Sequence, residues 1–68
     1  MIPLIVIDAA APEAEDVYRA ARGRGACIAV HGEAPWAEPS DRLDVGAASF
    51  LALYADRVVG GGLPAVLR

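Results

Sequence analysis

The sequence contains no lysine, threonine, asparagine or glutamine, and it has one cysteine and one histidine. Without lysine the chain cannot form a Schiff base, a phosphate-loop lysine contact or a kinase-type ion pair. The single cysteine, Cys27, cannot close an internal disulfide, and with His31 as the sole histidine the usual Cys/His zinc spacings cannot occur. We therefore expect neither a cofactor nor a metal centre.

Long apolar runs and basic stretches are missing as well. No apolar run reaches the length of about 18 residues that a membrane-spanning helix needs. All six basic residues are arginines dispersed among acids, and the net charge is −3, which argues against a nucleic-acid partner. The N-terminal stretch also lacks the positive charge of a signal peptide. We expect a cytoplasmic protein with neither a membrane nor a nucleic acid among its partners.

Apolar side chains, in contrast, are abundant: 56% of the 68 residues are hydrophobic. A chain of this length forms one small domain, here residues 1–68, and buries only about 60% of its unfolded surface. Such a domain usually needs a disulfide, a metal or an associated chain for stability. Since the sequence offers neither of the first two, we expect another protein chain, a second copy or a larger partner, to cover the apolar surplus.

The first half of the chain has the pattern of a βαβ unit. Residues 2–8 and 26–31 are continuous apolar runs, which are typical of strands buried on both faces of a parallel sheet. Between them, residues 12–23 have a proline and acids at the start and arginines and glycines at the end, as a helix favours. We predict two parallel strands joined by a right-handed crossover.

The second half has a weaker pattern. Residues 32–41 are predicted as a loop, and a shared apolar face predicts a helix over 47–58 that ends at the glycines 60–62. Residues 42–46 fit either a strand or the approach to that helix. Residues 63–67 are expected either as a short edge strand or as a tail. The predicted fold is a small single-domain α/β fold, a βαβ unit followed by a second helix.

Polar residues follow both predicted strands. Asp8 and His31 fall at the carboxyl ends of parallel strands, where open α/β sheets bind ligands, and Glu33 is close by in the sequence. These three side chains are candidates for binding a small ligand or a metal, or for moving a proton. The alternative is that they mark the points where buried strands reach the surface. Cys27 and His31 are about 13 Å apart on one strand and cannot form a nucleophile pair, so Cys27 is expected to be a buried small hydrophobe.

A second set of candidates consists of large apolar side chains in the second half. Trp36 lies in a loop between prolines and acids, where a rigid ring is a suitable anchor for another protein. The alternative is that Trp36 folds back and closes the end of the core. Phe50, Leu51 and Tyr54 share the apolar face of the second predicted helix. These four residues are the predicted partner-binding set.

Binding explains this sequence better than catalysis, because no catalytic motif with a specific spacing occurs in it. The leading hypothesis is a non-enzymatic protein-binding module, acting as a regulator, inhibitor or accessory subunit through an apolar surface. The alternative is a minimal enzyme, or a small-ligand or metal binder, that uses the strand-end crevice around Asp8 and His31. A third hypothesis makes the chain one piece of a larger assembly.

Overall fold

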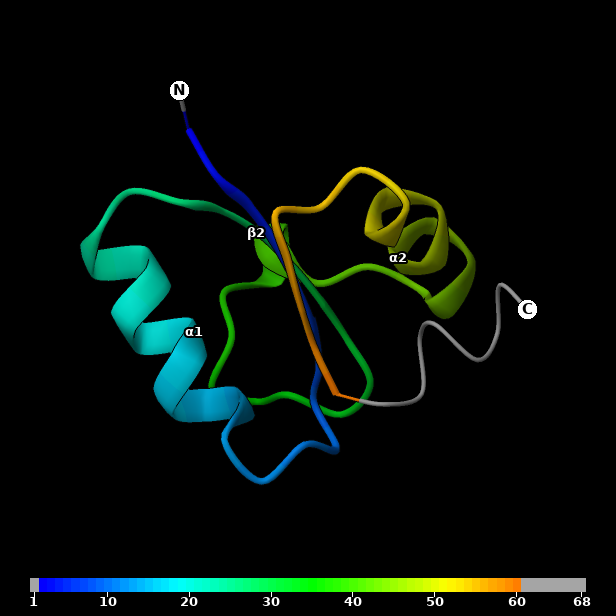
Figure 1. The fold of residues 1–68 in the computed structure, drawn as a ribbon. Coiled ribbons are helices and arrows are strands. Elements are labelled where there is room, and N and C mark those ends of the chain that lie inside the picture. The colour runs from blue at the N-terminus through cyan, green and yellow to red at the C-terminus, as the bar shows by residue number, and fades with distance from the viewer. Residues whose placement is uncertain (1, 61–68) are drawn as a thin grey trace.

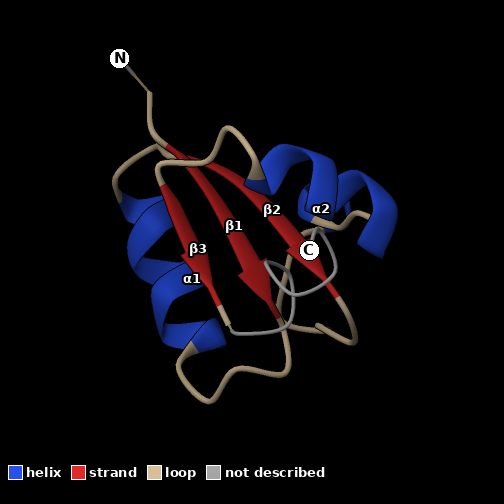
Figure 2. Ribbon diagram, turned by 45° about the vertical axis from the view of Figure 1, so that its right-hand side comes forward, coloured by secondary structure: helices blue, strands red, loops and turns tan. Residues whose placement is uncertain are grey.

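The computed structural model describes residues 2–60, which form a three-stranded parallel sheet with a helix on each face (Figure 1). The strand order is β2-β1-β3, so β1 is the central strand (Figure 2). The predicted α/β fold class is confirmed. In chain order the elements are β1 (Leu4–Asp8), α1 (Ala14–Gly23), β2 (Cys27–His31), a 3₁₀ turn η1 (Pro39–Asp41), α2 (Val45–Ala52) and β3 (Arg57–Val59).

The βαβ unit is confirmed, and its register is regular. β1 and β2 are parallel, with Leu4 opposite Cys27 at one end and Asp8 opposite His31 at the other. α1 begins at Ala14 rather than at residue 12, because residues 9–13 first form turns closed by N–H donation from Ala11 to the Asp8 carbonyl. The helix ends before a glycine at φ +72°, a backbone conformation that glycine adopts without strain.

The continuous apolar runs of β1 and β2 are explained by burial on both faces. Successive side chains of a strand point to opposite faces, so a strand covered on both sides has no polar position in its interior. On the α1 face, the buried cluster has members from the sheet, from α1 and from the loop after β2. The sheet supplies Ile7, Ile28, Val30 and Val59, the helix Ala14, Tyr18 and Ala21, and the loop Ala34 and Ala37. On the α2 face the cluster consists of Val6, Ala29 and Ala48.

The predicted helix over 47–58 is wrong in its second half. α2 ends at Ala52, and residues 57–59 instead form β3 beside β1, parallel to it. Asp56 anchors this strand, because its N–H donates to the Leu4 carbonyl while the Leu4 N–H donates to Asp56 Oδ2 (2.8 Å). The apolar spacing that favoured a longer helix therefore combines a helical face with a strand residue, Val58. The free edge of β1 determines where the helix stops.

The ends of α2 also differ from the sequence expectation. Asp44 caps the helix by accepting the Ala47 N–H on Oδ1 (2.8 Å), so α2 starts at Val45, inside the segment 42–46 that the pattern left open. Arg42, just before it, forms an isolated parallel bridge with Val30. The glycine at 60 follows β3 instead of ending a helix, and the expected strand or tail over 63–67 lies outside the described residues. No helix within residues 2–60 is long and apolar enough to cross a membrane.

Gly60 lies against the end of β1. Its φ is +101°, and a Cβ placed on it would lie 2.5 Å from the Asp8 Cβ. Real carbon atoms do not approach this closely without a shift of the backbone. The close contact between Gly60 and Asp8 therefore requires a residue without a side chain.

Amide hydrogen exchange tests the central position of β1. We expect the amides of Val6, Ile7 and Ala29 to exchange most slowly, because these three residues are buried and lie in paired strands. Hydrogen exchange followed by NMR measures this directly. Slower exchange in α2 than in β1 would contradict the prediction.

A pair of glycine substitutions tests the contact between β3 and β1. Gly60→Ala is expected to lower the free energy of unfolding by at least about 1 kcal/mol, because alanine is strained at this φ and its Cβ meets Asp8. Gly23→Ala is the matched control: its Cβ meets nothing within 4 Å and its φ is not positive, so a gain of about 0.4–1 kcal/mol is expected. Urea unfolding of both variants gives the comparison, and equal stability of the two would contradict it.

Candidate functional site

The structure brings Asp8 and His31 together at the carboxyl end of the sheet. They are register partners on β1 and β2, and His31 Nε2 lies 3.7 Å from Asp8 Oδ1. That distance is too long for a hydrogen bond. Asp8 Oδ1 instead accepts the Ala10 N–H (2.9 Å), so the carboxylate stabilises the turn that leaves β1. This is the bond expected of an acid at the point where a strand reaches the surface.

His31 has an unsatisfied nitrogen. Its side chain is 15% exposed, and Nε2 is buried without a hydrogen-bond partner among the described residues. Ser49 Oγ, on α2, is the other buried side-chain atom of residues 2–60 in this condition. A buried polar atom left unpaired costs about 1–3 kcal/mol, so a group that bonded to Nε2 would stabilise the fold. The ring nitrogen is able to accept or donate one hydrogen bond.

The rest of the predicted crevice is not assembled. Glu33 is exposed, and within residues 2–60 no group of three or more His, Cys, Asp or Glu side chains is placed to hold a metal ion. The sheet order puts the topological switch point between β1 and β3, where α/β sheets bind ligands. There the Gly60 backbone packs against the Asp8 side chain. Two of the three candidate residues are adjacent, and the space beside them is narrow.

Trp36 lies on the side of the molecule covered by α1. It is half-buried against the core cluster of that face, and its ring contacts the ring of Tyr18 at a centroid distance of 5.3 Å and an interplanar angle of 59°. Tilted aromatic pairs of this kind stabilise a fold beyond the area they bury. This position matches the interpretation in which Trp36 closes the end of the core.

Tyr18 holds the Trp36 loop in place, a role that the sequence pattern did not reveal. Its hydroxyl donates to Asp41 Oδ2 (2.7 Å) and accepts the Glu38 N–H (2.8 Å) and Arg22 Nη1 (3.3 Å). The hydrogen bond to Tyr18, together with the charge interaction between the two groups, raises the pKa of Arg22 above its ordinary value. The signal that could have revealed this contact is a tyrosine within the predicted helix, because a buried tyrosine hydroxyl usually has a hydrogen-bond partner.

The loop is held from its other end by Arg42. This side chain donates from Nε and Nη2 to the Ala37 carbonyl (3.1 and 2.7 Å) and from Nη2 to the Pro35 carbonyl (3.4 Å). Together with the hydrogen bonds of Tyr18, these contacts hold the chain in place both before and after Trp36. A side chain held in this way is poorly suited to swing out toward a partner.

The candidates at the end of α2 and in the turn that follows it, where Tyr54 lies, have a different environment. Phe50 is 59% exposed and Tyr54 68% exposed, and their ring centroids lie 5.6 Å apart. Leu53, which was not among the predicted residues, is 60% exposed, whereas Leu51 is half-buried against the core cluster of this face. We refer to Phe50, Leu53 and Tyr54 as the α2 patch. The eight residues of α2 include no charged side chain.

Cys27 is exposed, which corrects the expectation of a buried small hydrophobe. It is the first residue of β2, and β2 is an edge strand of the sheet. A residue at the start of an edge strand lacks cover on its outer side, although the sequence around it is apolar. The exposure of Cys27 thus depends on its place at the edge of the sheet, which no local sequence pattern reveals.

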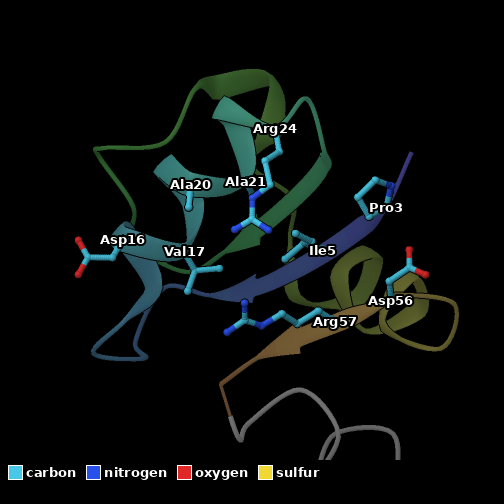
Figure 3. A pocket seen from close by; sticks show the side chains of 9 residues that line it. All are labelled: Pro3, Ile5, Asp16, Val17, Ala20, Ala21, Arg24, Asp56 and Arg57. Carbon is cyan, nitrogen blue, oxygen red and sulfur yellow. The ribbon is translucent and has the colours of Figure 1, made fainter. Parts of the chain in front are cut away.

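A groove runs between α1 and β3 (Figure 3). Its floor is apolar and its rim carries charges of both signs. We refer to it as the edge groove, and it is lined by Pro3, Ile5, Asp16, Val17, Ala20, Ala21, Arg24, Asp56 and Arg57. The sequence pattern predicts no site here, because it places residues 56 and 57 in a helix rather than beside β1.

Comparisons of the chain with protein-family models, with curated proteins and with solved structures find no match.

Proposed function

We propose that this protein is a non-enzymatic protein-binding module whose α2 patch docks into an apolar groove of a larger partner protein. The observation that carries this proposal is a group of three large, exposed apolar side chains in the last turn of an uncharged helix and directly after it. Surface helices of soluble domains normally carry charged residues on their outer face. A helix without them is suited to contact with another protein rather than with water.

The spacing of the α2 patch supports a helix-in-groove contact. Phe50 is in the last turn of α2, and Leu53 and Tyr54 lie in the turn that directly follows it. Their spacing of i, i+3 and i+4 is the one by which helical segments present anchors to a groove. Aromatic rings are enriched among the residues that dominate binding energy, because they bury a large area and lose few rotamers. The contact between the Phe50 and Tyr54 rings already orders both side chains before a partner arrives.

The role that follows is that of a regulator, inhibitor or accessory subunit. Such a protein needs one complementary surface and no reacting groups. We place it in the cytoplasm, since an exposed, unpaired Cys27 suits a reducing compartment.

Site-specific photo-crosslinking tests the α2 patch in the host cell. With benzoylphenylalanine in place of Phe50, we expect one dominant crosslinked species, and Tyr54→Asp in the same chain should weaken it at least about tenfold, since a charge at the contact resists desolvation. Benzoylphenylalanine at Arg19, an exposed position on α1, should not give this species. As a matched control, Ile2→Ser removes a side chain that is 70% exposed and lies outside the patch, and it should leave the crosslink intact. Equal crosslinking from positions 19 and 50 would contradict the proposal.

A second candidate function is the binding of a small polar ligand at His31. The observation that favours it is the buried, unpaired Nε2 beside the Asp8 carboxylate at the carboxyl end of the sheet. A ligand with a hydrogen-bonding group would satisfy this atom. The candidate ranks second because Gly60 and Asp8 are in close contact at the neighbouring switch point, which leaves little room.

Substitution of His31 separates the two candidates. Under the leading proposal, His31→Ala remains folded and keeps the Phe50 crosslink, because His31 is not part of the α2 patch. Thermal unfolding and crosslinking of the same variant are the two measurements. A loss of biological activity of about a hundredfold, which corresponds to about 2.8 kcal/mol, at unchanged Tm would favour the second candidate instead.

A further inference from the structure

β3 leaves its outer backbone groups unpaired within residues 2–60. The Cys27 N–H bonds to the Pro3 carbonyl, and alternate residues of a strand face the same neighbour, so on β1 the backbone groups of residues 5 and 7 face β2 and those of Val6 face β3. Val58 is the register partner of Val6, and at each register position of a parallel pair only one residue directs its N–H and C=O groups at the other strand. The backbone groups of Arg57 and Val59 therefore face β1, while those of Val58 point away from the sheet. An open edge of this kind is a template for pairing with another strand.

The edge groove beside this strand has opposite charges at its two ends. α1 runs antiparallel to the strands, so Asp16, in its first turn, lies toward the carboxyl end of the sheet, and Arg24 and Arg57 lie toward the amino end. Neither arginine forms an ion pair or a side-chain hydrogen bond within the described part of the chain. Their guanidinium groups extend over the groove (Figure 3), whereas the Asp56 carboxylate at the same end is held by the Leu4 N–H.

We propose that the outer edge of β3 and the edge groove form an interface with a second copy of this chain. The two β3 strands pair antiparallel about a twofold axis that passes beside Val58, and the two sheets become one continuous sheet. In this register Arg57 of each copy lies opposite Val59 of the other, and the outward N–H and C=O groups of Val58 in each copy bond to those of Val58 in the other.

The charges of the groove fit this twofold arrangement. Val59 belongs to the buried cluster that contains Ala14 and packs against Val17, so it lies beneath the first half of α1, where Asp16 is. An Arg57 side chain placed beside the Val59 of the second copy therefore approaches the Asp16 of that copy. The axis repeats this pairing on the other side, which is the self-complementarity that a twofold interface requires.

A second copy fits better than an unrelated acidic strand. An acidic peptide would satisfy the arginine end of the groove and meet repulsion at the Asp16 end. The interface is also separate from the α2 patch, which lies on the opposite face of the sheet (Figure 1), so the dimer presents two such patches. The proposal therefore goes beyond the protein-binding function and does not depend on it.

Charge reversal combined with light scattering on a size-exclusion column tests the interface. We expect a dimer for the natural sequence at micromolar concentration. The dissociation constant should rise at least about tenfold for Arg57→Glu and for Asp16→Arg, since each substitution places like charges together. Arg19→Glu, an equal charge change away from the groove, should have no effect.

An equimolar mixture of the two charge-reversed variants should form dimers again. In the mixed dimer the two substituted side chains carry opposite charges and face each other in one contact, while the unchanged Arg57 and Asp16 face each other in the second contact. Both contacts are then attractive. A monomeric natural protein, unaffected variants or a mixture that stays monomeric would each overturn the proposal.

An engineered disulfide provides a second measurement that does not depend on charge. In a Cys27→Ala background, Val58→Cys should form an interchain disulfide on mild oxidation, because the two Cα atoms of a hydrogen-bonded antiparallel pair lie about 5.5 Å apart, within the range of disulfides. Arg57→Cys is the control, since its counterpart is displaced along the strand. Equal crosslinking of the two variants, or none at position 58, would overturn the proposed register.

Discussion

The pairing of β1 on both of its edges is the constraint on which the rest of the structure depends. β1 supplies Val6 and Ile7, both fully buried, to the clusters beneath α2 and α1 respectively. Its hydrogen bonds align β2 and β3, and through them the two helices and the loop between Trp36 and Arg42. Because both core clusters are built on this strand, a domain of this size has no other layer to replace it.

Small side chains allow this compact arrangement and also limit it. Ala14, Ala21, Ala29 and Ala48 are nearly fully buried, so the helices lie close to the sheet. Little space then remains beneath them for large side chains. Phe50, Leu53 and Tyr54 stay outside, where they form the α2 patch. The surface that we propose for protein binding is thus a consequence of how the small core is filled.

The candidate site could be predicted in part. The proximity of Asp8 and His31 follows from two parallel strands of similar length, each ending in a polar residue. The exposure of Glu33 and the partial burial of Trp36 depend on the path of the loop after β2. Tyr18 and Arg42 direct that path through bonds to partners about 20 and 5 positions away in the chain, and no local pattern encodes such bonds. The edge groove was missed for the same kind of reason, because β3 was not recognised.

By itself, the sequence determined the βαβ unit, since two unbroken apolar runs around an amphipathic segment, with acids at its start and glycines at its end, have few other stable arrangements. It also excluded a disulfide framework and a thiolate zinc site through its composition. Only the tertiary structure decided that the helix predicted to reach residue 58 ends at Ala52 and that residues 57–59 form a strand. The local apolar spacing fits a helix, but β1 has a second edge whose N–H and C=O groups need partners, and β3 supplies them.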